Sequence, residues 1–337
     1  MKNGFTITRR GALLGLAAGG LLAKPGVLRA QGQVRLTLGH GTAPGNPRTV
    51  AADHFASVVR GRSNGRIEVR VAGAAQLGDD LAMLTGLRTG TLDMSVNSQG
   101  PVSSVVPELA TFGLPFLFAT SSAAFRTIDG QVTQEIVRKL ESVGLISLGW
   151  WDNGIRHVTN RRKPIETPED LRGMKIRTPA DPATIDTFQA LGAATQQINF
   201  NELYVALQQG VVDGQENPLA NIHSGKLHEV NRFISLTSHK WECSPFLVSR
   251  IAWGRLSEAD RRVIQEAAAE ATAANRRLMQ EADARLLAEY RANPAMTVNE
   301  ANLPLFRAAT VAVLDRWEQR PVGEFVKRLR SAATAAA

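Results

Sequence analysis

Two arginines in the middle of the chain stand where an anion could be bound. Arg177 lies near the end of the run MKIRTP, in which Pro179 stops a predicted strand, and Arg156 follows Gly154 in the run WWDNGIRHVTN. A guanidinium group donates two parallel hydrogen bonds to a carboxylate, and shielding from water strengthens them. These positions favour carboxylate recognition, although each arginine is also a candidate surface group or ion-pair partner.

A second set of polar side chains follows another predicted strand. The run LQQGVVDGQENP ends a helix at Gly210 and continues as a short strand to Asn217. An earlier run, from Leu87 to Asn97, has the same spacing of Leu, Gly, Asp and Asn, and chance similarity between two helix–glycine–strand units is the alternative explanation. Ligands of open α/β sheets sit beyond the carboxyl ends of the strands. Two strand ends tipped with an amide therefore predict a binding cleft between two lobes of similar build.

The elements that would position these groups alternate between strand and helix, which favours an α/β fold with a largely parallel sheet. Alternating apolar residues predict strands, and longer amphipathic runs ended by glycine predict helices. The predicted strands are 33–40, 66–73, 91–98, 174–179, 195–200 and 211–217, and the predicted helices are 52–65, 76–90, 181–192 and 201–210. Residues 256–294 form an alanine-rich pattern that predicts one long helix or a helix pair, and the tail RSAATAAA is expected to fray.

The first thirty residues predict an export signal. Paired Arg9 and Arg10 precede an apolar run rich in glycine and alanine that ends near Ala23. The pair partly matches a twin-arginine signal, and Ala30 offers a small residue for cleavage. We therefore expect residues 1–30 to be removed and the mature chain to work outside the cytoplasmic membrane.

Composition narrows the class of protein. The 337 residues carry a net charge of +8, but five of the 39 Lys and Arg residues fall in the first thirty positions, where there is no acid. The remaining 34 cations face 31 anions, without a basic stripe interleaved with aromatic residues, so nucleic acid is not an expected partner. An apolar content of 44% is ordinary for a globular protein, and this length suits two domains. Cys243 is the only cysteine, which predicts a buried, inert thiol and no intrachain disulfide.

No enzyme motif appears in the mature chain. It contains no P-loop, no dinucleotide glycine fingerprint and no nucleophile elbow. His223 and His228 are the nearest histidines, and a spacing of five does not suit a zinc pair on one helix face. We therefore predict no catalytic residue, no metal site and no cofactor.

Several runs resemble the solute-binding subunits of tripartite ATP-independent periplasmic (TRAP) transporters, the DctP-like family. They are NGIRHVTNRRKPIETPEDLRGMKIRTP, INFNELYVALQQGVVDGQENPLANI, LTSHKWECSPFLVS, GAAQLGDDLAML and LRTGTLDMSVNS. The resemblance covers nearly the whole mature chain. It implies an α/β, two-lobed, periplasmic-binding-protein-like fold, with mixed sheets flanked by helices and a long helix bracing both lobes. Lobe I would hold 31–153 and about 243–282, and lobe II would hold 154–242 and about 283–330.

The resemblance also implies a site for a small organic acid. Arg177 would form the bidentate salt bridge to the ligand carboxylate, and Arg156 would add a further contact. Asn217 would lie against the ligand and help to hold Arg177. The other residues implied at the site are Phe200, Asn97, Ser98, His40 and Gly41.

Two features bear on which acid is bound. Trp241 and Trp151 are candidates for the distal pocket or for core packing. Gly41, Ser98 and Ala180 stand where relatives that bind sialic acid usually carry Asn, Glu and Asn, which argues against that ligand. A dicarboxylate, a sugar acid and an aromatic acid all stay open.

The implied function is that of a periplasmic receptor. It would capture a small organic acid anion by hinge closure and deliver it, as a monomer, to a TRAP membrane permease. One alternative is an exported lyase or isomerase acting on a carboxylate, with His40 or Asp181 as its acid or base. Another is a ligand sensor for a receptor kinase.

Overall fold

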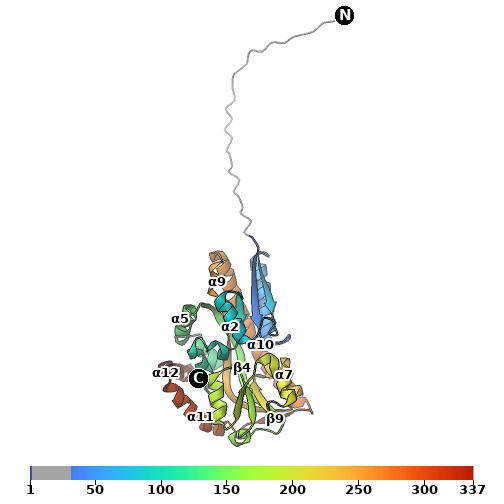
Figure 1. Cartoon of the computed structure of the whole chain (residues 1–337), viewed down its shortest axis with the longest axis vertical. Helices are drawn as coiled ribbons and strands as arrows, with labels where there is room; N and C mark the ends of the chain where they lie inside the picture. Colours follow the sequence, from blue (N-terminus) through green and yellow to red (C-terminus); the bar gives the residue numbers. More distant parts are fainter. Residues whose placement is uncertain (2–31, 337) are drawn as a thin grey trace. The chain divides into compact units, whose positions relative to one another are not determined.

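One nine-stranded mixed sheet runs through the part of the chain that the computed structural model describes, which is Met1 and residues 32–336 (Figure 1). The predicted export signal lies outside the described residues. None of the described helices is both long and apolar enough to cross a membrane.

The sheet consists of two parallel groups of strands joined by a long antiparallel pair. Its strand order is β2-β1-β3-β8-β4-β7-β5-β6, and β9 pairs with β8 away from this path. The strands are β1 (Val34–His40), β2 (Ile67–Ala72), β3 (Met94–Val96), β4 (Leu145–Asn160), β5 (Lys175–Thr178), β6 (Ala194–Gln197), β7 (Gly214–Asn217), β8 (Phe233–Ser249) and β9 (Thr297–Glu300). β1 is parallel to β2 and β3, and β5 is parallel to β6 and β7, whereas β4 and β8 are antiparallel to each other.

Helices flank the sheet and connect its strands. The α-helices are α1 (Pro47–Arg62), α2 (Asp80–Thr89), α3 (Gln99–Val102), α4 (Ser121–Ile128), α5 (Gln134–Ser142), α6 (Pro182–Ala190), α7 (Phe200–Gln209), α8 (Leu219–Ser224), α9 (Arg250–Gly254), α10 (Glu258–Ala292), α11 (Leu303–Glu318) and α12 (Gly323–Ala336). Short 3-10 helices are η1 (Pro107–Gly113), η2 (Gln131–Thr133), η3 (Pro168–Leu171) and η4 (Leu227–Glu229).

Each predicted strand and helix overlaps an observed element, and the disagreements have physical causes. α1 begins at Pro47 rather than at residue 52, because the Asn46 side chain caps it by accepting a hydrogen bond from the Arg48 amide. The prediction of a frayed tail was wrong: α12 continues to Ala336, with Leu329 and Ala333 buried in the core. The sheet is mixed, as the family resemblance implied. The local patterns predicted a largely parallel sheet because they did not reveal the antiparallel strands β4 and β8.

The repeated sequence pattern has a structural cause. Gly90 and Gly210 both end their helices in the left-handed conformation, with φ of 79° and 73°. Three residues later, Asp93 and Asp213 each accept a hydrogen bond at Oδ2 from the backbone amide of the neighbouring strand, in both cases at 2.9 Å. The pattern therefore marks the same helix-to-strand connection in each parallel group.

The long pair of β4 and β8 is irregular at three points along its register. The shifts fall between Ser147 and Gly149, between Asp152 and Gly154, and between Arg156 and Val158. Gly154 has φ of +107°, a conformation that residues with a side chain rarely adopt, and a Cβ there would approach Met279 within 3.1 Å. The middle of this pair is thus the most irregular part of the sheet.

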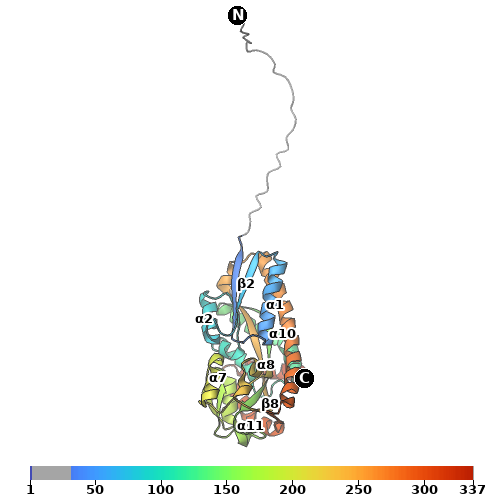
Figure 2. The ribbon, with the colours of Figure 1, turned by 90° about the vertical axis from the view of Figure 1, so that its right-hand side faces the viewer.

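The alanine-rich run 256–294 contains one long helix, α10 (Glu258–Ala292), and not a helix pair. Its N-cap Ser257 accepts a hydrogen bond from the Asp260 amide at 3.1 Å. The helix packs along α1 and against β4, α8 and β9, so it contacts elements of both parallel groups (Figure 2). Asn275 Oδ1 accepts a hydrogen bond from the Asp152 amide at 2.7 Å, which fixes the helix to the irregular part of β4.

Where α10 faces β4, the half-buried Asp283 has a shielded oxygen without a partner. Asp283 Oδ1 is shielded from solvent and has no hydrogen bond among the described residues. Burial and the nearby Asp152 carboxylate raise the pKa of Asp283 from 3.8 to about 7. The folded state therefore holds this proton up to about pH 7, whereas the unfolded chain releases it near pH 4, so the group's contribution to stability is lost as pH rises through that range.

We expect Asp283→Asn to stabilise the protein at pH 8 and to leave its stability nearly unchanged at pH 4. The gain at pH 8 should be about 1–4 kcal/mol, because a neutral amide replaces an unpaired buried carboxylate. Urea denaturation at several pH values measures it, with the exposed Asp53→Asn in α1 as the control. An equal gain at pH 4 and pH 8 would contradict the assignment of the shifted pKa to Asp283.

Candidate ligand-binding site

A cavity lies at the carboxyl ends of strands from both parallel groups. Gly41 follows β1, Ser98 follows β3, Ala180 follows β5 and Asn217 ends β7, and all four line it. Its volume is about 60 Å³. The geometry fits the general rule for ligand sites in open α/β sheets.

The structure brings six of the residues expected at the site to the cavity wall. They are Gly41, Ser98, Arg156, Arg177, Phe200 and Asn217. Phe200 is the first residue of α7 and is half-buried; it lines the cavity and also packs against the core cluster that includes Leu203 and Leu207.

Three expected site residues do not line the cavity. Asn97 is buried and donates a hydrogen bond to the Asp80 carbonyl at 2.7 Å. His40 is buried below the cavity, and burial together with Arg48 lowers its pKa to about 4, so the ring is neutral at pH 7. Trp241 is fully buried and donates to Asp152 Oδ1 at 2.8 Å. Their side chains belong to the core packing below the cavity.

Both tryptophans that were candidates for the distal pocket are core residues. The Trp241 ring packs edge-on against Phe118 and Phe125, with ring centroids 5.6 and 5.4 Å apart. Trp151 is also fully buried, and its ring packs against Phe246 with centroids 5.3 Å apart. Core packing, the alternative to a place in the distal pocket, is therefore what the structure shows for both tryptophans.

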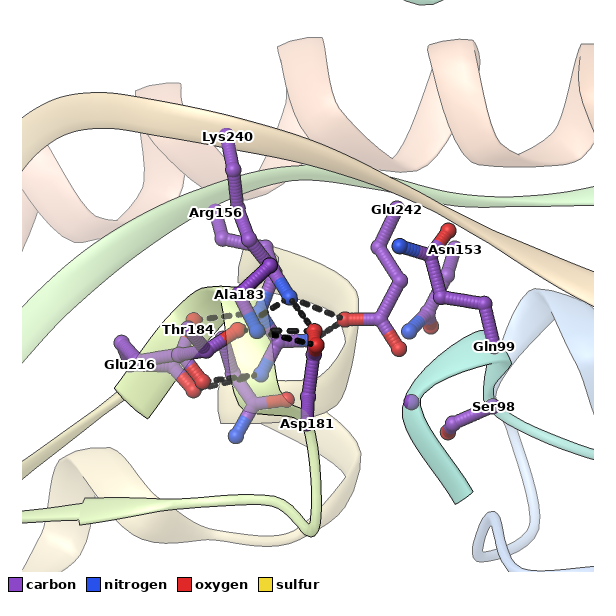
Figure 3. Close-up of polar contacts among 12 residues, drawn as sticks. Ser98, Gln99, Asn153, Arg156, Asp181, Ala183, Thr184, Glu216, Lys240 and Glu242 are labelled. Atoms are coloured by element: carbon purple, nitrogen blue, oxygen red, sulfur yellow. Dashed lines mark hydrogen bonds and ion pairs between the residues drawn. The ribbon is translucent and has the colours of Figure 1, made fainter. Parts of the chain in front are cut away.

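Arg156 is almost fully bound by the protein itself (Figure 3). Its Nη2 donates to the Glu216 carboxylate and to the Glu216 carbonyl, both at 2.7 Å, and its Nε donates to the same carboxylate. Its Nη1 lies 2.8 Å from Glu242 Oε2. The guanidinium group is 2% exposed and is held between two carboxylates, so little of its donor capacity is left for a ligand.

The ion pairs around Arg156 continue to charged residues that do not line the cavity. Lys240 Nζ donates to Asp181 Oδ2 at 2.6 Å and lies 3.3 Å from Glu242 Oε2 (Figure 3). His239 Nε2 lies 3.1 Å from Glu216 Oε2. Burial opposes ionisation of Glu216, but Arg156, with its hydrogen bonds, and the His239 ring hold the pKa of that carboxyl well below its usual range. We call Arg156, Glu216, Glu242, Lys240 and Asp181 the ion cluster.

Arg177 lies beside this cluster in a very different state. Its Nε donates to the Ile198 carbonyl at 2.8 Å, and its side chain is 3% exposed. Among residues 32–336 it forms no ion pair, and its two Nη atoms have no hydrogen-bond partner. Burial lowers the pKa of Arg177 to about 10, with the Arg156 cation adding to the effect and Glu216 opposing it. Arg177 is therefore a desolvated cation that faces the cavity without a counter-ion.

Asn217 lies at the cavity wall but does not hold Arg177. Its amide donates to Gln215 Oε1 and its carbonyl oxygen accepts a hydrogen bond from Asn221 at 3.2 Å. Asn221 continues this chain of amides to Asn153, also at the wall, with a donor–acceptor distance of 3.1 Å. The expected support of Arg177 by Asn217 is thus replaced by the Ile198 carbonyl.

Sequence reasoning missed several polar residues at the wall, among them Arg48, Asp80 and Asn153. Arg48 offered a local signal, since it is a cation in the first turn of a helix that has no acid there. Because the helix was predicted to start at residue 52, Arg48 fell outside it and this signal was missed. Asn153 is brought to the wall by the irregular part of β4.

Neither His40 nor Asp181, the acid or base candidates of the enzyme hypothesis, lies at the wall, and Asp181 is bound to Lys240 and Thr184. Within residues 32–336, no group of three or more His, Cys, Asp or Glu residues could hold a metal ion. Cys243 is buried, and burial raises the pKa of its thiol well above the usual value, as expected for an inert cysteine.

Comparison with solved structures agrees with this fold. The sugar-acid-binding protein of Advenella mimigardefordensis, solved with galactonate, superposes with a TM-score of 0.88 at 31% identity, covering 91% of this chain and 99% of that one. A TRAP periplasmic solute-binding protein of Sulfurospirillum deleyianum, solved with succinate, gives a TM-score of 0.86 at 29% identity, covering 89% and 99%. The fold and the cavity at the strand ends place the protein in the two-lobed solute-binding class.

The sequence comparisons identify the family. A model described as "Bacterial extracellular solute-binding protein, family 7" (DctP) matches residues 38–320, and the chain belongs to this family, which includes the solute-binding proteins of TRAP transporters. The protein y4mM of Sinorhizobium fredii is 54% identical over 315 residues, which cover 92% of this chain. This chain spans 58% of the length of y4mM.

In the absence of ligand, removing the charge of Arg156 should lower the free energy of unfolding, whereas removing that of Arg177 should not. Arg156→Met leaves Glu216 and Glu242 buried and unpaired, so we expect a loss of about 3–5 kcal/mol in the free energy of unfolding. Arg177→Met removes a buried cation that has no counter-ion, so we expect a change within about 1 kcal/mol or a gain. Urea denaturation of protein freed from carried-over ligand by refolding measures both. Equal losses in the two variants would contradict the assignment of Arg156 to the fold and Arg177 to the cavity.

Proposed function

We propose that the mature chain is a periplasmic receptor that captures a small organic acid anion and delivers it to a TRAP membrane permease. The observation that carries the proposal is Arg177, a buried cation at a cavity wall without a counter-ion. A ligand carboxylate would supply that counter-ion and accept the free Nη hydrogens as a bidentate pair. The acids bound to the two structural relatives, galactonate and succinate, support the same chemistry.

The other wall residues have separate roles in this proposal. Arg156 lines the cavity, but its ion pairs with Glu216 and Glu242 leave it little donor capacity for the ligand. Phe200 covers the cavity and excludes water, which strengthens the ion pair at Arg177. Asn217 and Ser98 offer polar contacts from the ends of β7 and β3.

Capture would proceed by closure about the irregular part of β4 and β8. The expected lobe boundaries, 153/154 and 242/243, fall at the register shift where Asp152 pairs with Cys243 and Gly154 with Glu242. Several side-chain hydrogen bonds join the expected lobes beside the cavity. Among them are Asn199 to Asp79 at 2.8 Å, Asn46 to Asn221 at 2.9 Å and Asn221 to Asn153 at 3.1 Å. Ligand contacts from both sides would shift the population towards the closed form.

Small-angle X-ray scattering should show this closure. Adding a bound acid to ligand-free protein should reduce the radius of gyration, and Arg177→Ala should remove the reduction because the ligand no longer binds. An unchanged radius with a saturating, calorimetrically verified ligand would contradict hinge closure and leave the binding role intact.

The remaining parts of the proposal concern partners and activity. Delivery to a permease, a monomeric state and periplasmic location rest on the family and on the predicted signal in residues 1–30. We propose no enzymatic activity, since the acid or base candidates His40 and Asp181 lie away from the cavity wall. If the protein docks on a receptor kinase instead of a permease, the proposed ligand and its contacts with Arg177 stay the same.

A thermal-shift screen of residues 31–337 against organic acids tests the binding function. Ligand at a hundred times its dissociation constant should add about 2.7 kcal/mol, a rise in melting temperature of roughly 5–10 °C at this size. Arg177→Ala should abolish the shift by costing about 2–5 kcal/mol of binding free energy. The exposed Arg172→Ala, just before the same strand, is the matched control. Shifts that survive in Arg177→Ala would refute the role of Arg177.

A further inference from the structure

Arg48 is a second buried cation at the cavity wall, and it comes from a different element than Arg177. It is the second residue of α1 and is 3% exposed. Its Nη2 donates to Asn153 Oδ1 at 3.0 Å and to the Ser244 hydroxyl, both neutral acceptors. Among the described residues it forms no ion pair, and its Nε and Nη1 have no hydrogen-bond partner.

The position of Arg48 is unfavourable for folding alone. The first turn of a helix carries a partial positive charge, and a cation there is repelled by it. α1 has 16 residues and no acid in its first turn. Burial, the largest effect, lowers the pKa of Arg48, and the Asp80 and Glu242 carboxylates only partly offset this. A cation placed in this way is explained by a group that it binds from the cavity.

Two further wall groups near Arg48 lack partners. Asn153 is 3% exposed, and its Nδ2 is buried without a hydrogen bond among the described residues. Asp80 Oδ1 is likewise buried and unpartnered, while its Oδ2 accepts a hydrogen bond from the Ser98 amide at 3.3 Å. A Cβ placed on Gly41 would lie 3.9 Å from Asp80 Oδ1, so this oxygen borders the cavity beside Gly41.

The three groups differ in what they can bind. Arg48 and Asn153 are donors and require an acceptor, whereas an Asp80 carboxylate is an acceptor and requires a donor. A hydroxyl group meets both needs, because it accepts one hydrogen bond and donates another. A second ligand carboxylate would satisfy the donors but would be repelled by Asp80 and by Glu242, which also lines the cavity.

We propose that Arg48, Asn153 and Asp80 form a hydroxyl-binding subsite, so that the protein selects hydroxylated monocarboxylates over dicarboxylates of the same length. This inference rests on the proposed function and adds the class of ligand to it. Arg177 takes the carboxylate, and the subsite takes hydroxyl groups farther along the chain of the same molecule. Arg48 and Asp80 are then the residues that determine specificity.

Isothermal titration calorimetry with acids paired by length tests the proposal. The pairs are erythronate and succinate, ribonate and glutarate, and gluconate and adipate, with butyrate as an acid without hydroxyl groups. In at least one pair, the hydroxy acid should bind ten times or more tightly than the dicarboxylate. Erythronate should also bind more tightly than butyrate.

Two variants show whether the named residues cause the preference. Asp80→Asn keeps the shape and removes the charge, so it should weaken hydroxy-acid binding at least tenfold and strengthen dicarboxylate binding. Arg48→Met should weaken hydroxy-acid binding at least tenfold and weaken butyrate binding much less. The exposed Arg60→Met on the same helix is the control and should change neither. Thermal unfolding without ligand confirms that each variant is folded.

The outcomes separate this proposal from the function on which it rests. Dicarboxylates that bind as tightly as the hydroxy acids in every pair would overturn the subsite and leave the receptor role standing. An unchanged preference in folded Asp80→Asn would do the same. Absence of binding by every acid would overturn the receptor role and the subsite together.

Discussion

The buried ion cluster around Arg156 is the interaction on which the rest of the site depends. Removing a guanidinium group and two carboxylates from water costs several kcal/mol for each ion, and close contacts among all three recover that cost. Arg156 lies on β4, Glu216 on β7 and Glu242 on β8, so the cluster ties three neighbouring strands together at the cavity wall. Because these carboxylates surround Arg156, Arg177 remains the neighbouring cation that faces the cavity without a counter-ion.

This division between two arginines shows how far sequence reasoning reaches. Arg177 was predicted correctly to lie at a strand end beside the cavity, because a proline and a short apolar strand mark that position locally. The partners of Arg156 lie 60 and 86 positions further along the chain, at Glu216 and Glu242, and nothing in a single sequence pairs residues over such distances. The strands β4 and β8 were not predicted, for a related reason. Their register shifts interrupt the alternation of apolar and polar residues that indicates a strand.

Core residues and cavity residues can be neighbours in the sequence, which explains why two of the expected site residues do not line the cavity. Asn97 and Ser98 are neighbours, yet the first is held inside by the Asp80 carbonyl and the second lines the cavity. His40 and Gly41 differ in the same way. Successive side chains at a strand end point to opposite sides, so a motif locates the site to within about one residue and side-chain packing decides which residue reaches it. The alternation of strands and helices, the helical character of 256–294 and the repeated helix-to-strand connection were accessible because each has a local pattern. The two-lobed mixed-sheet fold came from the family resemblance.

A crystal structure with a bound acid tests the central claim most directly. The acid should be the one that gives the largest thermal shift, soaked into or crystallised with protein refolded free of other ligands. The account predicts both carboxylate oxygens at about 2.7–2.9 Å from the Nη atoms of Arg177, with Arg156 still bound to Glu216 and Glu242. A carboxylate seated on Arg156 with Glu216 displaced, or an acid that leaves Arg177 without contact, would contradict it.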